Sequence, residues 1–334
     1  MRVARLYGVG DVRLQEEEPP RQMPGRSLVR VRAVGLCGSD LHWFSEGSIG
    51  DAKLQHPLVL GHEFSGIVEG GELDSRLVAV DPALPCGRCR TCAAGLRHLC
   101  PDVVFAGHGR QDGGLQELVS WPTSLLYPLP ESMSAEEGAL LEPLGVALHA
   151  LDLGHVHAGG HAVVVGCGPI GLLLVQLLLA SGMASVVAVD PLPHRRAVAQ
   201  DLGAQVTLSP EQFGDPDARV AGREGGADVS FEVAGSDQAV HFALEAVRPG
   251  GRVVLVGIPE GDRTSFRASL ARRKGLTILL SRRMGEVYPR AIRLVQDGAV
   301  DLEPLVSHRF DLPDAAAALE TAASRCGHKV LVTP

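Results

Sequence analysis

The first 130 residues contain short apolar stretches closed by glycine, and proline recurs throughout. Examples are SLVRVRAVGLCG (27–38) and PLVLGHEFSGIVEGG (57–71). Short apolar runs that end in glycine-containing turns predict β-strands. Long stripes with the 3.6-residue period of a helix are absent here. We therefore expect a first section rich in β-structure.

The first helix is expected near Ser134. The segment Ser134-Ala-Glu-Glu137 has the form of a capping box, which marks the start of a helix. An apolar stripe continues from this box through Leu140, Leu141, Leu144 and Leu148.

Beyond this helix, strand and helix patterns alternate. The predicted order is a strand at 162–165, an apolar helix ending near Gly182, a strand at 185–190, a helix at 193–202, a strand at 227–232, a helix at 236–248 and a strand at 252–257. Such alternation predicts an α/β domain with a doubly wound parallel sheet. After about residue 285 we expect another helix and a short mixed tail.

Length and composition limit the kinds of protein this chain can form. A chain of 334 residues is long for one core and suggests about two domains. A net charge of −8 gives no electrostatic reason to expect nucleic acid or anionic lipid as a partner. No signal peptide is visible, and the longest apolar run, 170–180, is too short to span a membrane. We expect a cytoplasmic protein with neither a nucleic-acid nor a membrane partner.

A glycine-rich turn between the strand at 162–165 and the following helix predicts a dinucleotide site. In Gly166-x-Gly168-x-x-Gly171, the first glycine permits the tight turn, the second lets the backbone approach a pyrophosphate, and the third lets helix and strand pack closely. Pro169 and Ile170 lie in the same turn, where the helix N-terminus favours phosphate. A glycine-rich turn can also be purely structural, but here strand, helix and an acidic residue are all in place.

That acidic residue, Asp190, ends the second strand of the α/β section. A carboxylate there would accept hydrogen bonds from the adenosine ribose and repel a 2′-phosphate, which favours NAD over NADP. Arg195 and Arg196 are close enough in sequence to weaken this preference. Solvated charges on a helix surface are the preferred interpretation of both arginines.

Four cysteines crowd into fifteen residues, at Cys86, Cys89, Cys92 and Cys100. Four thiolates so close together can complete a tetrahedral Zn²⁺ shell with no open position, which predicts a structural zinc site in a lobe at 86–100. An iron–sulfur cluster is the rival, because Pro101 follows the fourth cysteine, although the spacing differs from that of ferredoxins. A third interpretation is that the four cysteines are unrelated buried residues.

A second group of metal-ligating residues is scattered along the chain: Cys37, His62, Glu63 and Glu142. Individually each has an ordinary interpretation as a buried or surface residue. Together they supply a thiolate, an imidazole and carboxylate oxygens, a mixed set suited to a catalytic zinc with one exchangeable position. From the residues alone, this grouping and the ordinary interpretation carry equal weight.

These motifs occur in the same order as in a known family. Cys37-Gly-Ser-Asp-Leu-His42, Gly61-His-Glu63, the four-cysteine lobe, Glu142-Pro-Leu, the glycine-rich turn and the segment 304–310 resemble the zinc-containing medium-chain dehydrogenase/reductase family from end to end. The similarity is greatest to its polyol branch, which includes sorbitol, xylitol and L-idonate 5-dehydrogenases, with threonine dehydrogenase a near relative.

The resemblance implies a catalytic domain with a chaperonin-10-like β-barrel and an inserted Rossmann domain. The expected boundaries are 1–145 for the catalytic domain, 146–284 for the NAD-binding domain and 285–334 for the return to the catalytic domain. It also implies one catalytic and one structural Zn²⁺ per chain, with NAD as cofactor in preference to NADP. Relatives form dimers or tetramers, so a homodimer or homotetramer is expected.

By resemblance, Cys37, His62 and Glu63 match the positions of catalytic-zinc ligands. Glu142 matches a glutamate that binds the zinc directly or through its water. Which glutamate ligates the zinc at rest stays open. Ser39 and His42 match a proton relay that runs through the cofactor ribose to water. A backbone cap for Ser39 and a structural hydrogen bond for His42 are the alternatives.

The remaining implied positions concern substrate and nicotinamide. Trp43 and Phe44 match aromatic pocket positions, with core packing as the alternative, and Arg283 matches an arginine that reaches substrate and cofactor. Val256, in the strand RVVLVG, is expected to contact the cofactor. The implied activity is oxidation of a polyol or sugar-acid hydroxyl to a ketone, with hydride passed to NAD. A threonine or other secondary-alcohol dehydrogenase is the alternative, and a non-catalytic NAD-binding sensor a remote one.

Overall fold

The computed structural model describes residues 1–214 and 225–334. These residues group into two units. The first comprises Met1–Pro143, Gly285–Gln296 and Leu302–Pro334, and the second comprises Leu144–Met284 and Asp297–Asp301. Most of the tail thus belongs with the N-terminal part. The short segment at 297–301 belongs with the second unit, where the Gln176 side chain bonds to both the N–H and the carbonyl of Asp301.

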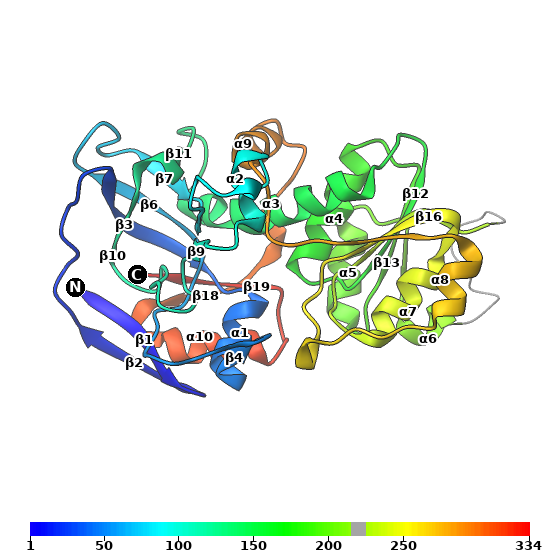
Figure 1. Ribbon diagram of the computed structural model, residues 1–334, viewed down its shortest axis with the longest axis horizontal. Helices are drawn as coiled ribbons and strands as arrows, with labels where there is room; N and C mark the ends of the chain where they lie inside the picture. Colours follow the sequence, from blue (N-terminus) through cyan, green and yellow to red (C-terminus); the bar gives the residue numbers. More distant parts are fainter. Residues whose placement is uncertain (215–224) are drawn as a thin grey trace. The chain divides into compact units, whose positions relative to one another are not determined.

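The first unit is built mainly from short strands, as its sequence pattern predicts. Its main sheet has the order β11-β7-β6-β3-β19-β18, and β10 also pairs with β3 (Figure 1). The strands of this unit are β1 (Arg2–Gly8), β2 (Asp11–Glu16), β3 (Arg26–Gly35), β4 (Ser48–Ile49), β5 (Ala52–Lys53), β6 (Glu63–Glu69), β7 (Leu77–Val80), β8 (Ala83–Leu84), β9 (Val104–Phe105), β10 (Leu118–Pro122), β11 (Leu126–Pro128), β18 (Val306–Asp311) and β19 (Lys329–Thr333).

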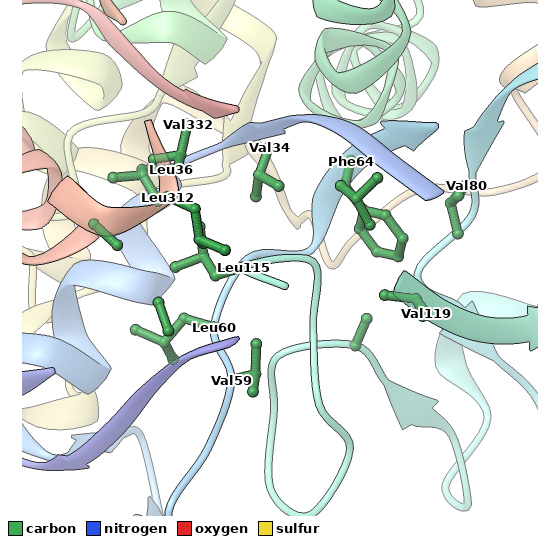
Figure 2. Close-up of a cluster of buried hydrophobic side chains, with 14 of the residues drawn as sticks. Val34, Leu36, Val59, Leu60, Phe64, Val80, Leu115, Val119, Leu312 and Val332 are labelled. Atoms are coloured by element: carbon green, nitrogen blue, oxygen red, sulfur yellow. The ribbon is translucent and has the colours of Figure 1, made fainter. Parts of the chain in front are cut away.

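Strand β3 joins the two ends of the chain. It pairs antiparallel with β6 on one side, where Gly35 faces Glu63, and antiparallel with β19 on the other, where Gly35 faces Leu331. Buried side chains of both ends share one core, because Val34, Phe64 and Leu115 belong to the same cluster as Leu312 and Val332 (Figure 2). The C-terminal strand therefore brings its residues beside the start of β6.

Helices of the first unit begin earlier than the sequence pattern predicts. The capping box at Ser134 is confirmed: the Ser134 N–H donates to the Glu137 carboxylate and the Glu137 N–H donates to the Ser134 hydroxyl. The expectation that this is the first helix is wrong, because α1 forms at Gly38–Glu46. The helices and 3-10 turns that begin in this unit are α1 (Gly38–Glu46), α2 (Arg90–Ala93), η1 (Arg97–Leu99), η2 (Thr123–Leu125), α3 (Ala135–Gly154), α9 (Tyr288–Gln296), η5 (Glu303–Leu305), η6 (Leu312–Asp314) and α10 (Ala315–Ala323).

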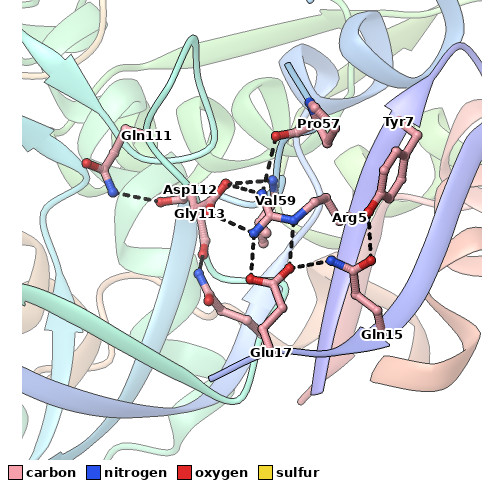
Figure 3. A network of polar contacts seen from close by, with 10 residues as sticks. Arg5, Tyr7, Gln15, Glu17, Pro57, Val59, Gln111, Asp112 and Gly113 are labelled. Atoms are coloured by element: carbon pink, nitrogen blue, oxygen red, sulfur yellow. Dashed lines mark hydrogen bonds and ion pairs between the residues drawn. The ribbon is translucent and has the colours of Figure 1, made fainter. Parts of the chain in front are cut away.

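An ion-pair network fastens the first strand to two loops of this unit. The Arg5 guanidinium donates to the carboxylates of Glu17 and Asp112 and to the Pro57 carbonyl (Figure 3). Asp112 in turn accepts the N–H of Val59. Because the Arg5 side chain is only 14% exposed, these charge-assisted bonds are weakly screened by water. They fix the segment that leads into His62.

The second unit contains the parallel sheet expected from the alternating pattern. Its order is β14-β13-β12-β15-β16-β17, and every pairing is parallel. The strands are β12 (His161–Val165), β13 (Ser185–Val189), β14 (Val206–Leu208), β15 (Ala227–Glu232), β16 (Val247–Leu255) and β17 (Thr277–Leu280). The helices are α4 (Pro169–Ala180), α5 (Pro193–Asp201), α6 (Pro210–Gly214), α7 (Asp237–Ala246) and α8 (Ala268–Lys274), with the 3-10 turn η4 (Glu260–Asp262).

The strand order reverses between β12 and β15, which are neighbours. From β12 the chain proceeds through α4 and α5 to β14 at one edge, and from β15 through α7 and α8 to β17 at the other. Right-handed crossovers then place the two helix pairs on opposite faces of the sheet. A reversal of this kind opens a crevice at the carboxyl ends of the strands. No helix in the described part of the chain is long and apolar enough to cross a membrane.

Candidate active site and metal centres

Three of the scattered metal-ligating residues meet in the first unit. Ligand atoms of Cys37, His62 and Glu63 all lie within 4.8 Å of one another. Their donor set of sulfur, nitrogen and carboxylate oxygen fits Zn²⁺, which accepts all three. His62 and Glu63 are buried and Cys37 is half-buried, so the cluster is sheltered but accessible.

Local structure explains how these residues converge. Cys37 is the N-cap of α1, two residues after the end of β3, and Glu63 is the first residue of β6. The Asp40 carboxylate lies between them, because it accepts the N–H groups of Cys37 and Gly61 at 2.9 and 3.1 Å. Its Oδ1 is also 3.5 Å from Nδ1 of His62. A carboxylate behind a ligating imidazole fixes the orientation and tautomer of the ring.

The cluster is electrostatically suited to a cation. Burial by itself lowers the pKa of the His62 imidazole, but the negative groups Asp40 and Cys37 more than reverse this and raise the pKa well above its ordinary value. A buried proton acceptor surrounded by negative charge favours any positive species that takes the place of the proton. A metal dication meets that requirement.

Lys329 forms an ion pair with Glu63. Its ammonium lies 2.8 and 2.7 Å from the two carboxylate oxygens and 3.0 Å from the Leu36 carbonyl, and the side chains are 2% and 1% exposed. Gly35 is in β3, which lies between the strand of Glu63, β6, and the strand of Lys329, β19. A methyl group on Gly35 would overlap Oε2 of Glu63. The absence of a side chain at Gly35 is therefore what lets the carboxylate reach the lysine.

Glu142 lies in α3 and is buried, at 4% exposed. Its ligand atoms fall outside the 4.8 Å group formed by the other three residues. Burial raises the pKa of Glu142 to about 7, and the charge of Glu63 adds to this, whereas His62 and Lys329 oppose it. Glu142 is thus electrostatically coupled to the cluster and would gain from a cation beside it.

The four cysteines of the 86–100 lobe form a second group, with sulfur atoms within 4.8 Å of one another. The Cys89 sulfur is 3.4 Å from that of Cys92 and 3.8 Å from that of Cys100. A disulfide would require about 2.05 Å. A tetrahedron with Zn–S bonds of about 2.3 Å has edges of about 3.8 Å. The Thr91 hydroxyl and the Cys92 N–H also lower the pKa of the Cys89 thiol to about 6, which favours a thiolate.

The two expected relay residues and the two expected aromatic pocket residues lie on α1. Ser39 is half-buried, and the imidazole of His42 bonds to the Glu46 carboxylate at 2.8 Å. Trp43 and Phe44 are 1% and 7% exposed and belong to the core of the first unit. The structure therefore places these two aromatic residues in the packed interior.

The glycine-rich turn has the geometry that its spacing predicts. Gly166 has φ +107°, and a methyl group on Gly171 would overlap the Gly166 carbonyl, so only glycine permits this turn against α4. A methyl on Gly168 would meet nothing nearer than Arg195, at 3.8 Å. Gly168 therefore presents open backbone at the N-terminus of α4, with Pro169 and Ile170 in the first turn of that helix.

Asp190 follows β13 and is 3% exposed. Its carboxylate accepts the N–H of Cys167 at 2.7 Å and that of Leu192 at 2.8 Å, which connects it to the glycine-rich turn. Each oxygen still has a lone pair for a ligand hydroxyl. The Arg196 guanidinium is bound to the carbonyls of Asp190 and Pro191.

The last two expected cofactor residues also lie in the second unit. The Val256 N–H donates to the Glu232 carbonyl at 2.8 Å, directly beyond the carboxyl end of β16. Arg283 is half-buried and has φ +55°, a left-handed backbone conformation that is uncommon for this residue type.

Three residues of the first unit escaped the sequence analysis as functional candidates. Asp40 had a readable signal, because it stands three residues after Cys37, where an acidic residue closes a capping box. No local pattern in the sequence marks Lys329, because 266 residues separate it from Glu63. His108 was also missed; its ring accepts the indole N–H of the buried Trp43.

Comparison with known proteins identifies the class. Residues 23–131 match the family model described as alcohol dehydrogenase GroES-like domain, and residues 169–297 match zinc-binding dehydrogenase. Sorbitol dehydrogenase of Bacillus subtilis is 31% identical over 96% of this chain and 93% of its own length. The fold and sites define a zinc-dependent, nicotinamide-linked alcohol dehydrogenase.

Solved structures agree with this class. L-idonate 5-dehydrogenase from Escherichia coli has a TM-score of 0.93 and 31% identity, covering 100% of this chain and 98% of that one. A zinc-binding dehydrogenase from Sinorhizobium meliloti, bound to NADP, has a TM-score of 0.90 and 32% identity, covering 100% and 99%. The chain belongs to the zinc-containing medium-chain dehydrogenase/reductase family, in its polyol branch.

Proposed function

We propose that the protein oxidises a secondary hydroxyl of a polyol or sugar acid to a ketone and passes the hydride to NAD. The observation that carries the proposal is the convergence of Cys37, His62 and Glu63 within 4.8 Å, with the buried Glu142 coupled to them. A glutamate in the segment LLEPL, in place of the cysteine of ordinary alcohol dehydrogenases, favours the polyol branch.

We assign Cys37, His62 and Glu63 to the catalytic zinc and the four-cysteine lobe to a structural zinc. When bound, the catalytic ion supplies Lewis-acid activation of the substrate oxygen and the nicotinamide accepts hydride. Lys329 keeps Glu63 ion-paired, so Glu63 is the restrained carboxylate of the two. Glu142 forms no ion pair of this kind in the described part of the chain, and we assign it as the exchangeable carboxylate.

Ser39 and His42 are our candidates for removing the proton. They are three residues apart in α1, a spacing that places two side chains on the same helix face. His42 bonds to the exposed Glu46, which connects the outer end of this path to solvent. We assign the proton path from Ser39 through the cofactor ribose to His42.

Binding of NAD rather than NADP is proposed from Asp190. Its carboxylate is fixed by two backbone N–H groups, so it is already oriented to accept a ribose hydroxyl and to repel a 2′-phosphate. Gly166, Gly168, Pro169, Ile170 and Gly171 form the expected pyrophosphate turn. Arg195, Val256 and Arg283 complete the proposed cofactor contacts, and a homodimer or homotetramer is the proposed assembly.

A substrate and cofactor panel on zinc-replete protein tests the function. L-idonate, sorbitol, xylitol, L-threonine and 2-propanol are each assayed with NAD and with NADP. We expect the highest kcat/KM with NAD and a polyol or sugar acid. A highest value with threonine or 2-propanol would replace the proposal with an amino-acid or simple secondary-alcohol dehydrogenase.

A further inference from the structure

A cavity of about 500 Å³ lies within the second unit, away from the proposed cofactor site. It is lined mainly by the loop between α3 and β12, by the start of β15 and by residues 248–252 of β16. His161 is the first residue of β12, and Asp228 is the second of β15, so the cavity lies at the amino ends of these parallel strands. The glycine-rich turn follows the carboxyl end of β12. The cavity and that turn therefore lie at opposite ends of the same sheet.

Two arginines line the cavity, and they differ in their partners. Nε of Arg248 donates to Oδ1 of Asp228 at 2.8 Å, and Oδ2 of Asp228 accepts the N–H of His161 at 2.8 Å. Arg252 is half-buried and has no hydrogen bond or ion pair with any residue that the structure describes. The Asp228 charge is thus compensated by Arg248, and the Arg252 charge is not compensated by the chain. An unpaired, half-buried guanidinium favours an anionic ligand, because its planar N–H groups match carboxylate and phosphate oxygens.

Three histidines add hydrogen-bond donors to the same cavity. His155, His157 and His161 all line it, and an imidazole carries at least one N–H in either protonation state. Nδ1 of His161 lies 2.6 Å from the Ser185 hydroxyl, whereas its Nε2 is buried and meets no partner in residues 1–214 and 225–334. A buried polar atom of this kind calls for a partner from outside the chain.

The remainder of the wall suits an organic molecule. A methyl group on Gly159 would meet nothing within 4 Å, so the backbone there borders open space and a ligand can approach it closely. Val156 and Met183 add apolar surface. Cavities of roughly 300–1,000 Å³ with apolar walls and a few polar groups are typical of small-molecule sites. The volume therefore fits an organic molecule better than a bare ion.

We propose that this cavity is a second ligand site, which binds a small organic phosphate monoester through Arg252 and the histidines. A phosphate offers three terminal oxygens and a charge near −2, which matches one guanidinium and several imidazole donors better than the two oxygens of a carboxylate. The inference is independent of the proposed function, because neither the Cys37–His62–Glu63 cluster nor the glycine-rich turn takes part in it.

Calorimetric titration of zinc-replete protein with phenyl phosphate, with and without saturating NAD, tests the site. We expect saturable binding of one phenyl phosphate per chain that persists in the presence of NAD, and weaker binding of benzoate. Arg252→Met should raise the dissociation constant for phenyl phosphate at least about tenfold, because it removes a charge-assisted hydrogen bond. Arg252→Lys should lie between wild type and Arg252→Met, because it keeps the charge but not the planar pair of donors.

Arg273→Met is the matched control. Arg273 is an exposed residue of α8 that does not line the cavity, so its removal changes the net charge equally and should leave the dissociation constant unchanged. Because Arg252 has no partner within the described residues, its replacement should also leave the melting temperature unchanged, which verifies that the variants are folded.

Several results would overturn the inference. These are no saturable binding by wild type, an equal dissociation constant in Arg252→Met, an equal loss in Arg273→Met, and displacement of phenyl phosphate by NAD. Benzoate binding as tight as that of phenyl phosphate would exclude a phosphate ester as the preferred ligand. The titration does not depend on turnover, so a failure of the proposed function appears only in the substrate panel and is distinguishable from a failure here.

Discussion

Replacement of Lys329 by methionine should show how strongly the stability of the catalytic cluster depends on a buried positive charge. The Lys329 ammonium contacts both oxygens of Glu63 and the Leu36 carbonyl, and almost none of the pair is exposed. Burial by itself lowers the pKa of Lys329, but Glu63, Cys37 and Glu142 raise it above its ordinary value. The lysine is therefore charged in the folded protein, and its removal leaves the buried Glu63 carboxylate without its ion-pair partner.

The size of the effect follows from this burial. Removing one partner of a buried ion pair costs about 3–5 kcal/mol, because the remaining charge is neither paired nor hydrated. At about 2–4 °C per kcal/mol for a unit of this size, the melting temperature should fall by about 6–20 °C. Zinc bound beside Glu63 supplies positive charge in place of the lysine, so added zinc should restore more stability to Lys329→Met than to wild type.

Thermal unfolding followed by circular dichroism, with and without added zinc after mild chelation, measures both effects. Arg309→Met is the matched control, because Arg309 also pairs with two carboxylates, Glu136 and Glu303, but is 47% exposed. Such an exposed pair contributes about 0–1 kcal/mol. The double variant Glu63→Gln/Lys329→Met should recover part of the loss, because it leaves no buried charge.

Two results would refute this reasoning. A Lys329→Met protein that melts within about 2 °C of wild type without zinc would mean that Glu63 is neutral or reaches water. A double variant no more stable than Lys329→Met would mean that lost packing, and not an unpaired charge, causes the destabilisation.

Three further predictions concern other sites. Cys86→Ser should reduce zinc content by one ion per chain and lower the melting temperature while the NAD dissociation constant is unchanged; equal zinc content would exclude a metal in the lobe. Asp190→Ala should raise the KM for NAD at least about tenfold and that for NADP less, because it removes the ribose acceptor; unchanged discrimination would assign specificity elsewhere. Burial raises the pKa of Asp81 to about 6, above its unfolded value of 3.8, so folding loses stability as pH rises from about 4 to 6. Asp81→Asn should therefore stabilise the protein at pH 7.5 by up to about 3 kcal/mol but not at pH 4, measured by urea unfolding; equal gains at both pH values would exclude this cause.

Much of the second unit could be predicted because its signals are local. The strand at 162–165, the glycine spacing from Gly166 and the carboxylate at Asp190 are each read within a few residues, and the parallel sheet follows from alternation. Short elements without a clear period were missed, among them β14, β17, α8 and α10. The helix α1 also escaped, because its glycine, serine and aspartate start hides a helix of only nine residues.

The candidate site was predictable as far as residue type reveals chemistry. Cys37, His62 and Glu63 are natural zinc ligands, and the structure brings them together. Lys329 looks like an ordinary charge in a C-terminal strand, and only the pairing of β19 with β3 places it at Glu63. The ring of Trp43 lies in the core of the first unit and its indole N–H bonds to His108, so its place in a substrate pocket stays a prediction. Contacts between distant segments of the chain account for what the sequence could not reveal.

The central claim is that Cys37, His62 and Glu63 hold the metal on which oxidation depends. Zinc content, measured together with turnover, in Cys37→Ser and wild type tests it most directly. The account predicts two zinc ions per chain in wild type, one in the variant, no measurable oxidation by the variant and unchanged NAD binding. A Cys37→Ser protein that keeps both ions and oxidises substrate at the wild-type rate would contradict it.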